Sequence, residues 1–511
     1  MNLLIHRDGQ QYGPYTFEQA RAALADGSLL PTDLAWPDGA KDWVPLAKVL
    51  KSTPALRPQR SRGKSMALVL LGGFVVLLAV WGVWRIRLAS QISAHLAAVK
   101  AAGYPTSPAE LDAWYAAVPE KENAALLVIQ ATNLLAKQNP GNSKTFEVLK
   151  MLPRTAPLPA ELRSAYTAEL DASRAGLVLF HQVAKLTNSR YPVDLNGGVL
   201  ANLNHIPPVK RAAVLLQEEA LLAADGARQG TTAPDSLLAC LGVGRTLKSE
   251  PLLISQLVRV AVDNMATAAL QRTLNRAAFT DAQLASLAAA FSEADDPSAF
   301  ARALAGERAG TIFFFRMSRS DLARLSNATS DEIGKAVVNE VPRGLGFTGI
   351  FERDLLFYLK AMETNIVLLN LPAPQSLVAT NASDALCLEA RRKYCIFSAL
   401  LLPAYGKLAI KVADGSARLR IATSALAVER FRLAHQNQLP DSLAALVPTY
   451  LPSVPTDPWD GQPLRFKKLA KGYVVYSVGP DGKDDDGTDQ ALDEKGKKVP
   501  GPFDITFTVE R

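Results

Sequence analysis

The sequence predicts a multidomain protein with a small α/β N-terminal domain, one transmembrane helix, a large mainly α domain and a C-terminal α+β domain that joins a long helix to a small antiparallel sheet. Three observations lead to this prediction. The chain has 511 residues, too many for one hydrophobic core. One uncharged apolar run is long enough to cross a bilayer. Strand-like segments lie near both ends of the chain, and helical patterns fill the part between them.

These patterns divide the chain into five predicted segments. Hydrophobic residues make up 48% of the chain, which excludes a disordered protein. The predicted segments are a small domain at 1–50, a basic linker at 51–65, a transmembrane helix at 66–86, a helical domain at 88–403 and a C-terminal domain at 404–511.

The first fifty residues have the local signals of a compact α/β unit. Asp8 and Gly9 are turn formers after a short apolar run. Thr16 and Gln19 have the spacing of a capping box at the start of a helix, which Gly27 would end. The predicted strands are Leu3 to Arg7, Leu34 to Trp36 and Trp43 to Leu46.

This segment contains three specific motifs: Tyr12-Gly13-Pro14-Tyr15, "DGSLLPTDLAW" and the ending "DWVPL". With them, the segment resembles the bacterial GYF-like domain. That resemblance implies a proline-rich peptide partner, docked on a surface of Tyr12, Tyr15, Trp36 and Trp43. A proline-rich helix is pre-ordered and stacks on flat rings at low entropic cost. The same aromatic residues could instead be the core of a very small domain, so both interpretations stay open.

The predicted transmembrane helix rests on the run from Met66 to Trp84, which has 19 residues and no charge. Such a helix spans roughly 28 Å, about the thickness of the bilayer core. Trp81 and Trp84 lie at one end, where aromatic rings favour the membrane interface. A buried core helix does not explain these end-placed tryptophans. A cleaved signal peptide would not follow 65 residues of preceding chain.

The positive charge of the chain is concentrated around this run. Between Lys51 and Arg87 there are seven basic residues and no acidic one, which accounts for the whole net charge of +7. A nucleic-acid partner is therefore not expected, because such binding needs a basic folded surface. Six basic residues precede the run (Lys48 to Lys64) and three follow it (Arg85 to Lys100), which predicts a cytoplasmic N-terminus in an inner membrane and an extracytoplasmic, periplasmic bulk. The linker charge would also favour anionic lipid.

The long middle segment has helix-start signals but no catalytic motif. Ser107, Pro108 and Glu110 predict one helix start, and Thr280 with Gln283 predicts another. Stacked helical hairpins would fit the pattern. The stretch "VPEKENAALLVIQA" resembles uncharacterised envelope proteins of the Planctomycetes–Verrucomicrobia kind, a resemblance that implies no activity.

No catalytic residue is predicted, and the protein is not expected to be an enzyme. The five histidines lack H-E-x-x-H spacing, and the chain contains no G-x-S-x-G, P-loop or G-x-G-x-x-G motif. The glycines of "CLGVGRTLKS" do not have P-loop spacing, and His181 is interpreted as a satisfied core residue. The three cysteines have no C-x-x-C pair and are expected to be buried small apolar residues: Cys240, Cys387 and Cys395.

The last hundred residues predict a long helix followed by three strands. The helix covers Tyr405 to Gln438, and the strands are Leu464 to Leu469, Gly472 to Val478 and Ile505 to Val509. The ordered motifs "LPDSLAALV", "VPTDPWDGQPLRF", "YVVYSVGPDGKDDDG" and "DITF" make the region from Ala425 to Val509 resemble the C-terminal half of the major pseudopilins of type II secretion. That resemblance implies a helix packed on a small antiparallel sheet and a calcium-binding loop.

The chain departs from the pseudopilin pattern at its other end. The apolar helix lies far upstream, follows an unrelated domain and lacks the glutamate at its fifth position. We therefore do not expect processing or polymerisation like those of a pilin.

The acidic loop gives the predicted metal site. By the pseudopilin resemblance, Ca²⁺ would be held by Asp481, Asp484, Asp485, Asp486 and Asp489, with Asp504 from the next strand. Calcium takes six to eight oxygen ligands on a flexible loop. The loop is not an EF-hand, because Gly482 would stand where the first aspartate belongs. A solvated acidic turn is the alternative, since Asp and Gly are ordinary turn residues.

The leading functional hypothesis is non-enzymatic. In this hypothesis the protein is an envelope scaffold or protein-interaction component. One form of this role would be associated with secretion. Two alternatives stay open: an enzyme with a dispersed site in the helical domain, and a transmembrane sensor that links a periplasmic ligand or calcium to the cytoplasmic module.

Overall fold

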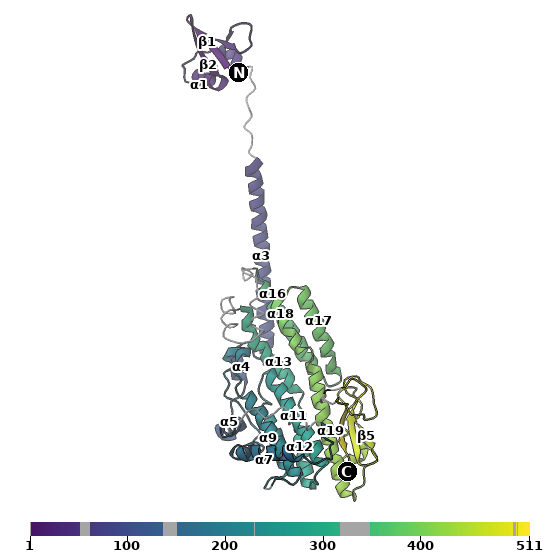
Figure 1. Ribbon diagram of the computed structural model, residues 1–511. Coiled ribbons are helices and arrows are strands. Elements are labelled where there is room, and N and C mark those ends of the chain that lie inside the picture. The colour runs from purple at the N-terminus through teal and green to yellow at the C-terminus, as the bar shows by residue number, and fades with distance from the viewer. Residues whose placement is uncertain are drawn as a thin grey trace. The chain divides into compact units, whose positions relative to one another are not determined.

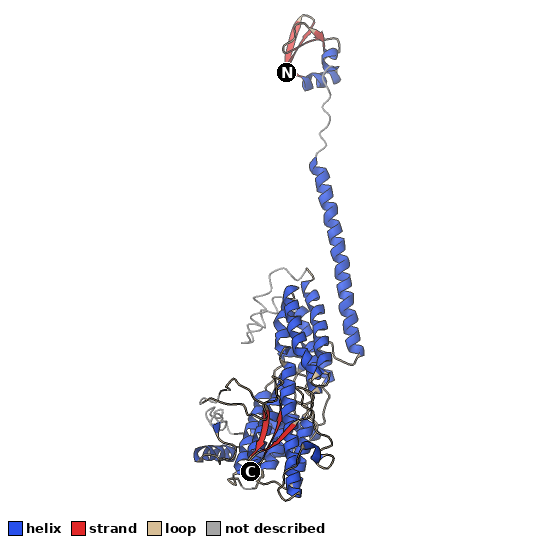
Figure 2. Ribbon diagram, turned by 90° about the vertical axis from the view of Figure 1, so that its right-hand side faces the viewer, coloured by secondary structure: helices blue, strands red, loops and turns tan. Residues whose placement is uncertain are grey.

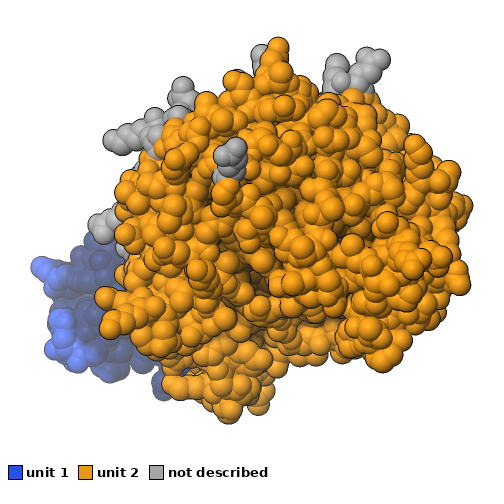
Figure 3. Space-filling view, turned by 90° about the horizontal axis from the view of Figure 1, so that it is seen from below, with its two compact units in different colours: residues 1–83 blue, residues 84–511 orange. Residues whose placement is uncertain are grey.

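The computed structural model describes residues 2–51, 62–135, 151–228, 230–316, 348–493, 497 and 499–511. The chain divides into two compact units, Met1–Val83 and Trp84–Arg511, which Figure 3 colours separately. Most of the predicted basic linker, residues 52–61, lies outside the described part of the chain.

The first unit contains a four-stranded sheet in the order β2-β1-β3-β4, with antiparallel neighbours. Its core is formed by Leu3, Ile5, Ala20, Leu29, Ala35, Leu46, Val49 and Leu50. The elements are β1 (Asn2–Arg7), β2 (Gln10–Thr16), α1 (Phe17–Ala25), β3 (Leu34–Pro37), β4 (Val44–Pro45) and α2 (Leu46–Lys51).

The predicted start of α1 is confirmed. The Thr16 side chain accepts a hydrogen bond from the Gln19 N–H at 3.2 Å, and the Gln19 side chain accepts one from the Thr16 N–H at 2.9 Å. Asp8 and Gly9 both have positive φ and form the turn between β1 and β2. The sequence did not predict β2 or α2. β2 carries Gly13 and Pro14, which are disfavoured in strands, and is held by its hairpin pairing with β1.

One long helix, α3 (Arg62–Ala101), contains the predicted transmembrane run. The large apolar side chains between Met66 and Ile86 are exposed. The helix continues well past the predicted end of the span, because Leu88, Ile92 and Val99 are buried within the second unit. The division between the two units therefore falls inside α3 (Figure 1).

Two helical stretches in the described part of the chain are long and apolar enough to cross a membrane, whereas the sequence predicted one. They differ in burial. The most apolar window of Met66–Ala101 is 0% buried, and that of Ile396–Ala434 is 44% buried. The second stretch contains α19, which packs against α11, α12 and the C-terminal sheet. Hydropathy selects both, because a helix enclosed by protein is as apolar as one enclosed by lipid.

The second unit is mostly helical, as predicted. Its α-helices, besides the end of α3, are α4 (Pro108–Trp114), α5 (Ala124–Asn133), α7 (Ala160–Ala172), α8 (Arg174–Val183), α9 (Ile206–Ala224), α10 (Ala233–Arg245), α11 (Leu253–Leu274), α12 (Asp281–Ala294), α13 (Ser298–Thr311), α16 (Ile350–Leu369), α17 (Val378–Arg392), α18 (Ile396–Leu401) and α19 (Leu408–Ala434). Short 3₁₀ helices are η1 (Glu120–Glu122), η2 (Leu195–Leu200), η3 (Ile312–Arg316), η5 (Gln375–Leu377), η6 (Leu402–Tyr405) and η7 (Leu443–Leu446).

The two predicted helix starts have different outcomes. The capping box of Thr280 and Gln283 is present. At α4, the Ser107 side chain accepts from the Glu110 N–H as expected, but the Glu110 carboxylate accepts from the Thr106 N–H at 2.8 Å. Glu110 therefore reaches one residue further back than the predicted box, and Lys100 adds a salt bridge to it.

The C-terminal sheet is small and antiparallel, as predicted, with the order β5-β6-β7. Its strands are β5 (Arg465–Lys468), β6 (Tyr473–Ser477) and β7 (Ile505–Val509). They lie against the helices of the unit (Figure 2). β6 and β7 contact α19, and the Tyr473 hydroxyl donates to the Ala425 carbonyl at 3.1 Å. The long helix itself is shorter at both ends than predicted.

One hydrophobic cluster runs from α9, α10, α11 and α12 through α19 into the C-terminal sheet. Leu216, Leu270, Leu426, Val475 and Phe507 are all fully buried members of it. The predicted boundary at 403/404 thus falls within one compact unit. A second cluster joins α13, α16 and α18 to the end of α3 through Leu88 and Ile92.

Substitution of two glycines tests how closely the backbone is packed at the edge of the C-terminal sheet. Gly472 has a φ of +75°, and an added Cβ would overlap the Val509 carbonyl oxygen. Gly482 has a φ of +68° and open space around the same position. Alanine at either site costs about 1–2 kcal/mol for the left-handed backbone. We expect Gly472→Ala to cost about 1–3 kcal/mol more, because β7 must shift.

Chemical denaturation of the full-length protein in detergent measures this difference, with Gly482→Ala as the matched control. Equal losses of stability in the two variants would mean that the end of β7 moves aside freely.

Candidate functional sites

The sheet register of the first unit places three of the four predicted aromatic residues, and it puts them on two faces. Tyr12 pairs with Ile5 and Tyr15 pairs with Leu3, so both tyrosines lie on the face that carries the core. Trp36 pairs with Leu4, whose side chain alternates to the other face.

Trp36 and Trp43 instead form an aromatic cluster with His6. The two tryptophan rings meet edge to face with centroids 5.5 Å apart, and His6 lies 5.4 Å from Trp43. All three side chains are half-buried. We call His6, Trp36 and Trp43 the outer aromatic cluster. His6 was not among the predicted residues, although its position two residues after Leu4 on one strand puts it on the same face.

The two tyrosines contribute differently. Tyr15 packs against the core of the unit, together with Phe17, Ala23, Leu24 and Val44. Tyr12 is 43% exposed, and its hydroxyl donates to Gln10 at 3.2 Å. Of the two interpretations left open by the sequence, the core fits Tyr15, whereas a surface fits the two tryptophans.

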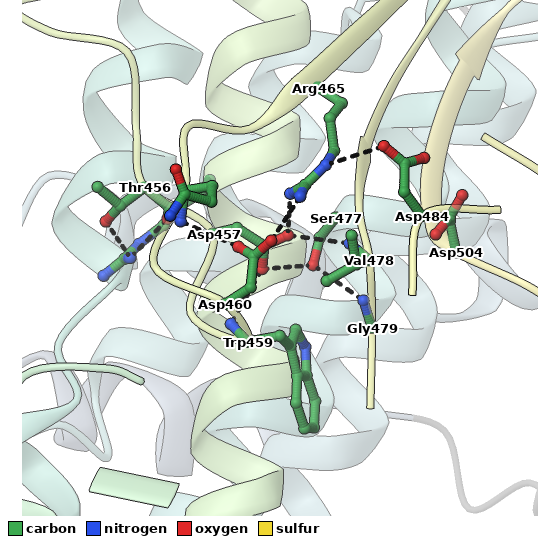
Figure 4. A network of polar contacts seen from close by, with 12 residues as sticks. Thr456, Asp457, Trp459, Asp460, Arg465, Ser477, Val478, Gly479, Asp484 and Asp504 are labelled. Atoms are coloured by element: carbon green, nitrogen blue, oxygen red, sulfur yellow. Dashed lines mark hydrogen bonds and ion pairs between the residues drawn. The ribbon is translucent and has the colours of Figure 1, made fainter. Parts of the chain in front are cut away.

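The turn before the C-terminal sheet is organised by one buried carboxylate (Figure 4). Asp457 accepts hydrogen bonds from the Ser477 hydroxyl at 2.8 Å and the Val478 N–H at 2.9 Å. Arg465 donates to Asp457 at 3.0 Å and to Asp484 at 3.3 Å. This network ties the acidic loop to β5 and fixes its start.

The side chains of four of the six predicted calcium ligands contact other side chains or a nearby backbone N–H. Asp484 pairs with Arg465, and Asp486 pairs with Lys467. Asp481 accepts from the N–H of Lys483, and Asp489 contacts Arg154 and Thr506. A fifth, Asp504, is held by backbone N–H groups.

Asp504 and Asp485 are the predicted ligands with buried oxygens. Asp504 accepts from the Gly487 N–H at 2.8 Å and the Asp485 N–H at 3.4 Å. Burial raises its pKa, and the nearby charges of Asp484 and Asp485 act in the same direction. The Oδ2 atom of Asp485 is buried and accepts no hydrogen bond from the described residues.

The charges of Asp484 and Asp485 lie near enough to Asp504 to affect its carboxyl. The described residues hold no group of three His, Cys, Asp or Glu side chains arranged for a metal ion. Calcium binding at the six aspartates therefore stays a prediction.

Two histidines of the helical body lie beside buried carboxylates. His181 lies 2.7 Å from the Glu219 carboxylate, and the buried His205 lies 3.0 Å from Glu250. All three cysteines are free; Cys240 and Cys395 are buried, and Cys387 is half-buried.

Residues 4–50 match the family model GYF domain 2. This range covers nearly all of the N-terminal sheet and the helices α1 and α2. No curated protein and no solved structure matches the chain. The resemblances to pseudopilins and to the Planctomycetes–Verrucomicrobia proteins rest on their sequence motifs.

Proposed function

We propose that this protein is a membrane-anchored interaction protein whose GYF module binds a proline-rich segment of a partner protein. The match of residues 4–50 to GYF domain 2 carries the proposal. It supports a protein-interaction role for the first unit. The outer aromatic cluster supplies a surface with suitable chemistry.

Edge-to-face tryptophans suit a proline-rich ligand. Such a segment already has the extended polyproline conformation, so binding orders little additional chain. The Trp36 and Trp43 rings are held by each other and by His6, which lowers the entropy lost on binding. Their half-buried state leaves ring surface for proline rings to cover.

The exposed apolar part of α3 supports the membrane anchor. From Met66 to Ile86 its large apolar side chains face outward, and burial in lipid would remove this surface from water. We place the N-terminal module in the cytoplasm and the helical body across the inner membrane, on the basis of the Lys and Arg asymmetry.

The proposal also includes a link to secretion and calcium binding at the acidic loop. It rests on the pseudopilin-like motifs and on the buried, unpartnered Asp485 oxygen. A cation there would offset the repulsion among Asp484, Asp485 and Asp504.

Peptide binding tests the module. We expect full-length protein in detergent to bind a proline-rich peptide, and Trp43→Ala to weaken binding about tenfold or more through loss of ring stacking. Isothermal titration calorimetry measures the affinity. Tyr12→Ala is the control on the other face and should bind as the parent does. Loss of binding in Tyr12→Ala alone would move the site to the core-side face.

Reporter fusions test the topology. A phosphatase that is active only outside the cytoplasm should be active when fused after Gln91 and silent when fused after Lys48, because basic residues hold the N-terminal flank inside. The reverse pattern would contradict the proposed orientation.

Thermal melting tests calcium. A cation bound only by the folded state stabilises it by about 2.7 kcal/mol at a hundredfold excess over Kd. We expect the full-length protein to melt at a higher temperature in millimolar calcium than in chelator, with a smaller effect of magnesium because of its stricter octahedral geometry.

Asp485→Asn should remove most of that calcium effect. Asp441→Asn is the control, because Asp441 lies outside the acidic loop, is 99% exposed and pairs with Lys468. Equal melting temperatures of the parent protein in calcium and in chelator would make the loop a solvated turn.

A further inference from the structure

The helical body contains a cleft of about 480 Å³ between α8, α10, α11 and α12. Its volume lies within the range of small-molecule sites. Small and apolar side chains form part of the wall, among them Leu238, Leu241 and Ala290. Neither the GYF module nor the acidic loop contributes to it.

Glycines on α10 explain how these helices approach each other. A Cβ on Gly242 would lie 2.9 Å from the Cα of Ala184 on the α8 side, and a Cβ on Gly244 would lie 3.1 Å from the Asp263 carboxylate. The glycines of "CLGVGRTLKS" therefore serve close packing. This stretch also brings Arg245 and Lys248 to the cleft.

Asp263 on α11 is the unusual group of the cleft. Its side chain is 3% exposed and accepts no hydrogen bond from the described residues. The neighbouring Arg259 donates instead to the carbonyls of Ala294 and Asp296 and to the Gln256 side chain. A buried carboxylate without a hydrogen-bond donor is costly, so a ligand that supplies one would bind strongly there.

Burial also changes the protonation of Asp263. It raises the pKa of the carboxyl to about 7, with the Arg259 charge lowering that pKa and the Asp295 charge raising it. Burial raises the pKa of the Cys240 thiol on α10, and the Asp263 charge acts in the same direction, so this thiol stays protonated.

Positive charges also line the cleft. Lys185 is exposed, and Lys248 pairs with Asp296 at 3.7 Å while 34% of its side chain stays exposed. The acidic lining residues besides Asp263 are Asp235, which accepts from Thr232, and Glu293. Arg245 is held by Glu293 at 3.2 Å and by the carbonyls of Ala184 and Leu186. An unpartnered carboxylate and two accessible ammonium groups thus line one cavity.

We propose that this cleft binds a small zwitterion, a free amino acid or a short peptide, whose ammonium group pairs with Asp263 and whose carboxylate pairs with Lys185 and Lys248. The apolar wall would contact the aliphatic part of the ligand. Charge-assisted hydrogen bonds in a low-dielectric cavity are stronger than the same bonds in water. Binding is proposed and not catalysis, because the described lining residues hold no nucleophile hydrogen-bonded to a base.

Calorimetry on the full-length protein in detergent tests the cleft with three probes: alanine, tri-alanine with free termini, and N-acetyl-tri-alanine. We expect alanine or tri-alanine to bind. A comparison of their affinities shows which ligand size the cleft prefers. N-acetylation should weaken tri-alanine binding by about tenfold or more, since it removes the ammonium group. Equal affinity of the acetylated probe, or no binding of alanine or tri-alanine at millimolar concentration, would overturn the proposal.

Asp263→Asn should weaken binding by a similar factor while leaving the protein folded. Asp441→Asn is the control, because Asp441 is 99% exposed on another part of the unit. Unchanged ligand affinity in Asp263→Asn would also overturn the proposal.

Stability against pH separates a binding role of Asp263 from a structural one. A carboxyl whose folded pKa is raised from 3.8 to about 7 makes the folded state bind more protons, so its contribution to stability falls as pH rises between these values. Asp263→Asn should therefore match the parent protein near pH 4 and become progressively more stable than it toward pH 8. A lower melting temperature of Asp263→Asn at pH 8 would mean that the carboxylate is a structural partner, which contradicts the proposal.

Discussion

The enclosure of α19 is the constraint on which the second unit depends. Its apolar surface faces α11 and α12 on one side and β6 and β7 on the other, so one helix joins the helical body to the C-terminal sheet. Even Glu429 on this helix is buried, paired with Arg432 at 2.9 Å and with Arg511 at 2.5 Å. Losing this helix would expose the inner surfaces of both the body and the sheet, and so the two cannot be separated without exposing a large core.

The two halves of α3 have different surroundings. The N-terminal half of α3 exposes its large apolar side chains, whereas its C-terminal half buries Leu88 and Ile92 among α13, α16 and α18. The backbone of α3 is helical from Arg62 to Ala101, so one continuous element carries both kinds of surface.

Buried carboxylates show which polar groups serve the fold and which are candidates for function. Asp457 and Asp354 are both fully buried and accept several hydrogen bonds, which is how a folded core accommodates a charge. Asp263 and the Oδ2 atom of Asp485 are buried without such donors among the described residues. This contrast is the physical reason for the two ligands proposed, an ammonium group at the cleft and a cation at the loop.

The sequence by itself determined the features that depend on neighbours within a few residues: the capping boxes at Thr16 and Thr280, the three C-terminal strands, the apolar run in α3 and the GYF-type motifs of the first fifty residues. Local hydrogen bonds and periodicity decide these features, so a single sequence contains the information. Only the tertiary structure decided that Tyr12 and Trp36 lie on opposite faces of one sheet, that the apolar α19 is enclosed by protein, and that Asp263 faces a cleft without a donor. Each of these depends on strand register or helix packing between residues far apart in the chain, and such contacts leave no local pattern that a single sequence could reveal.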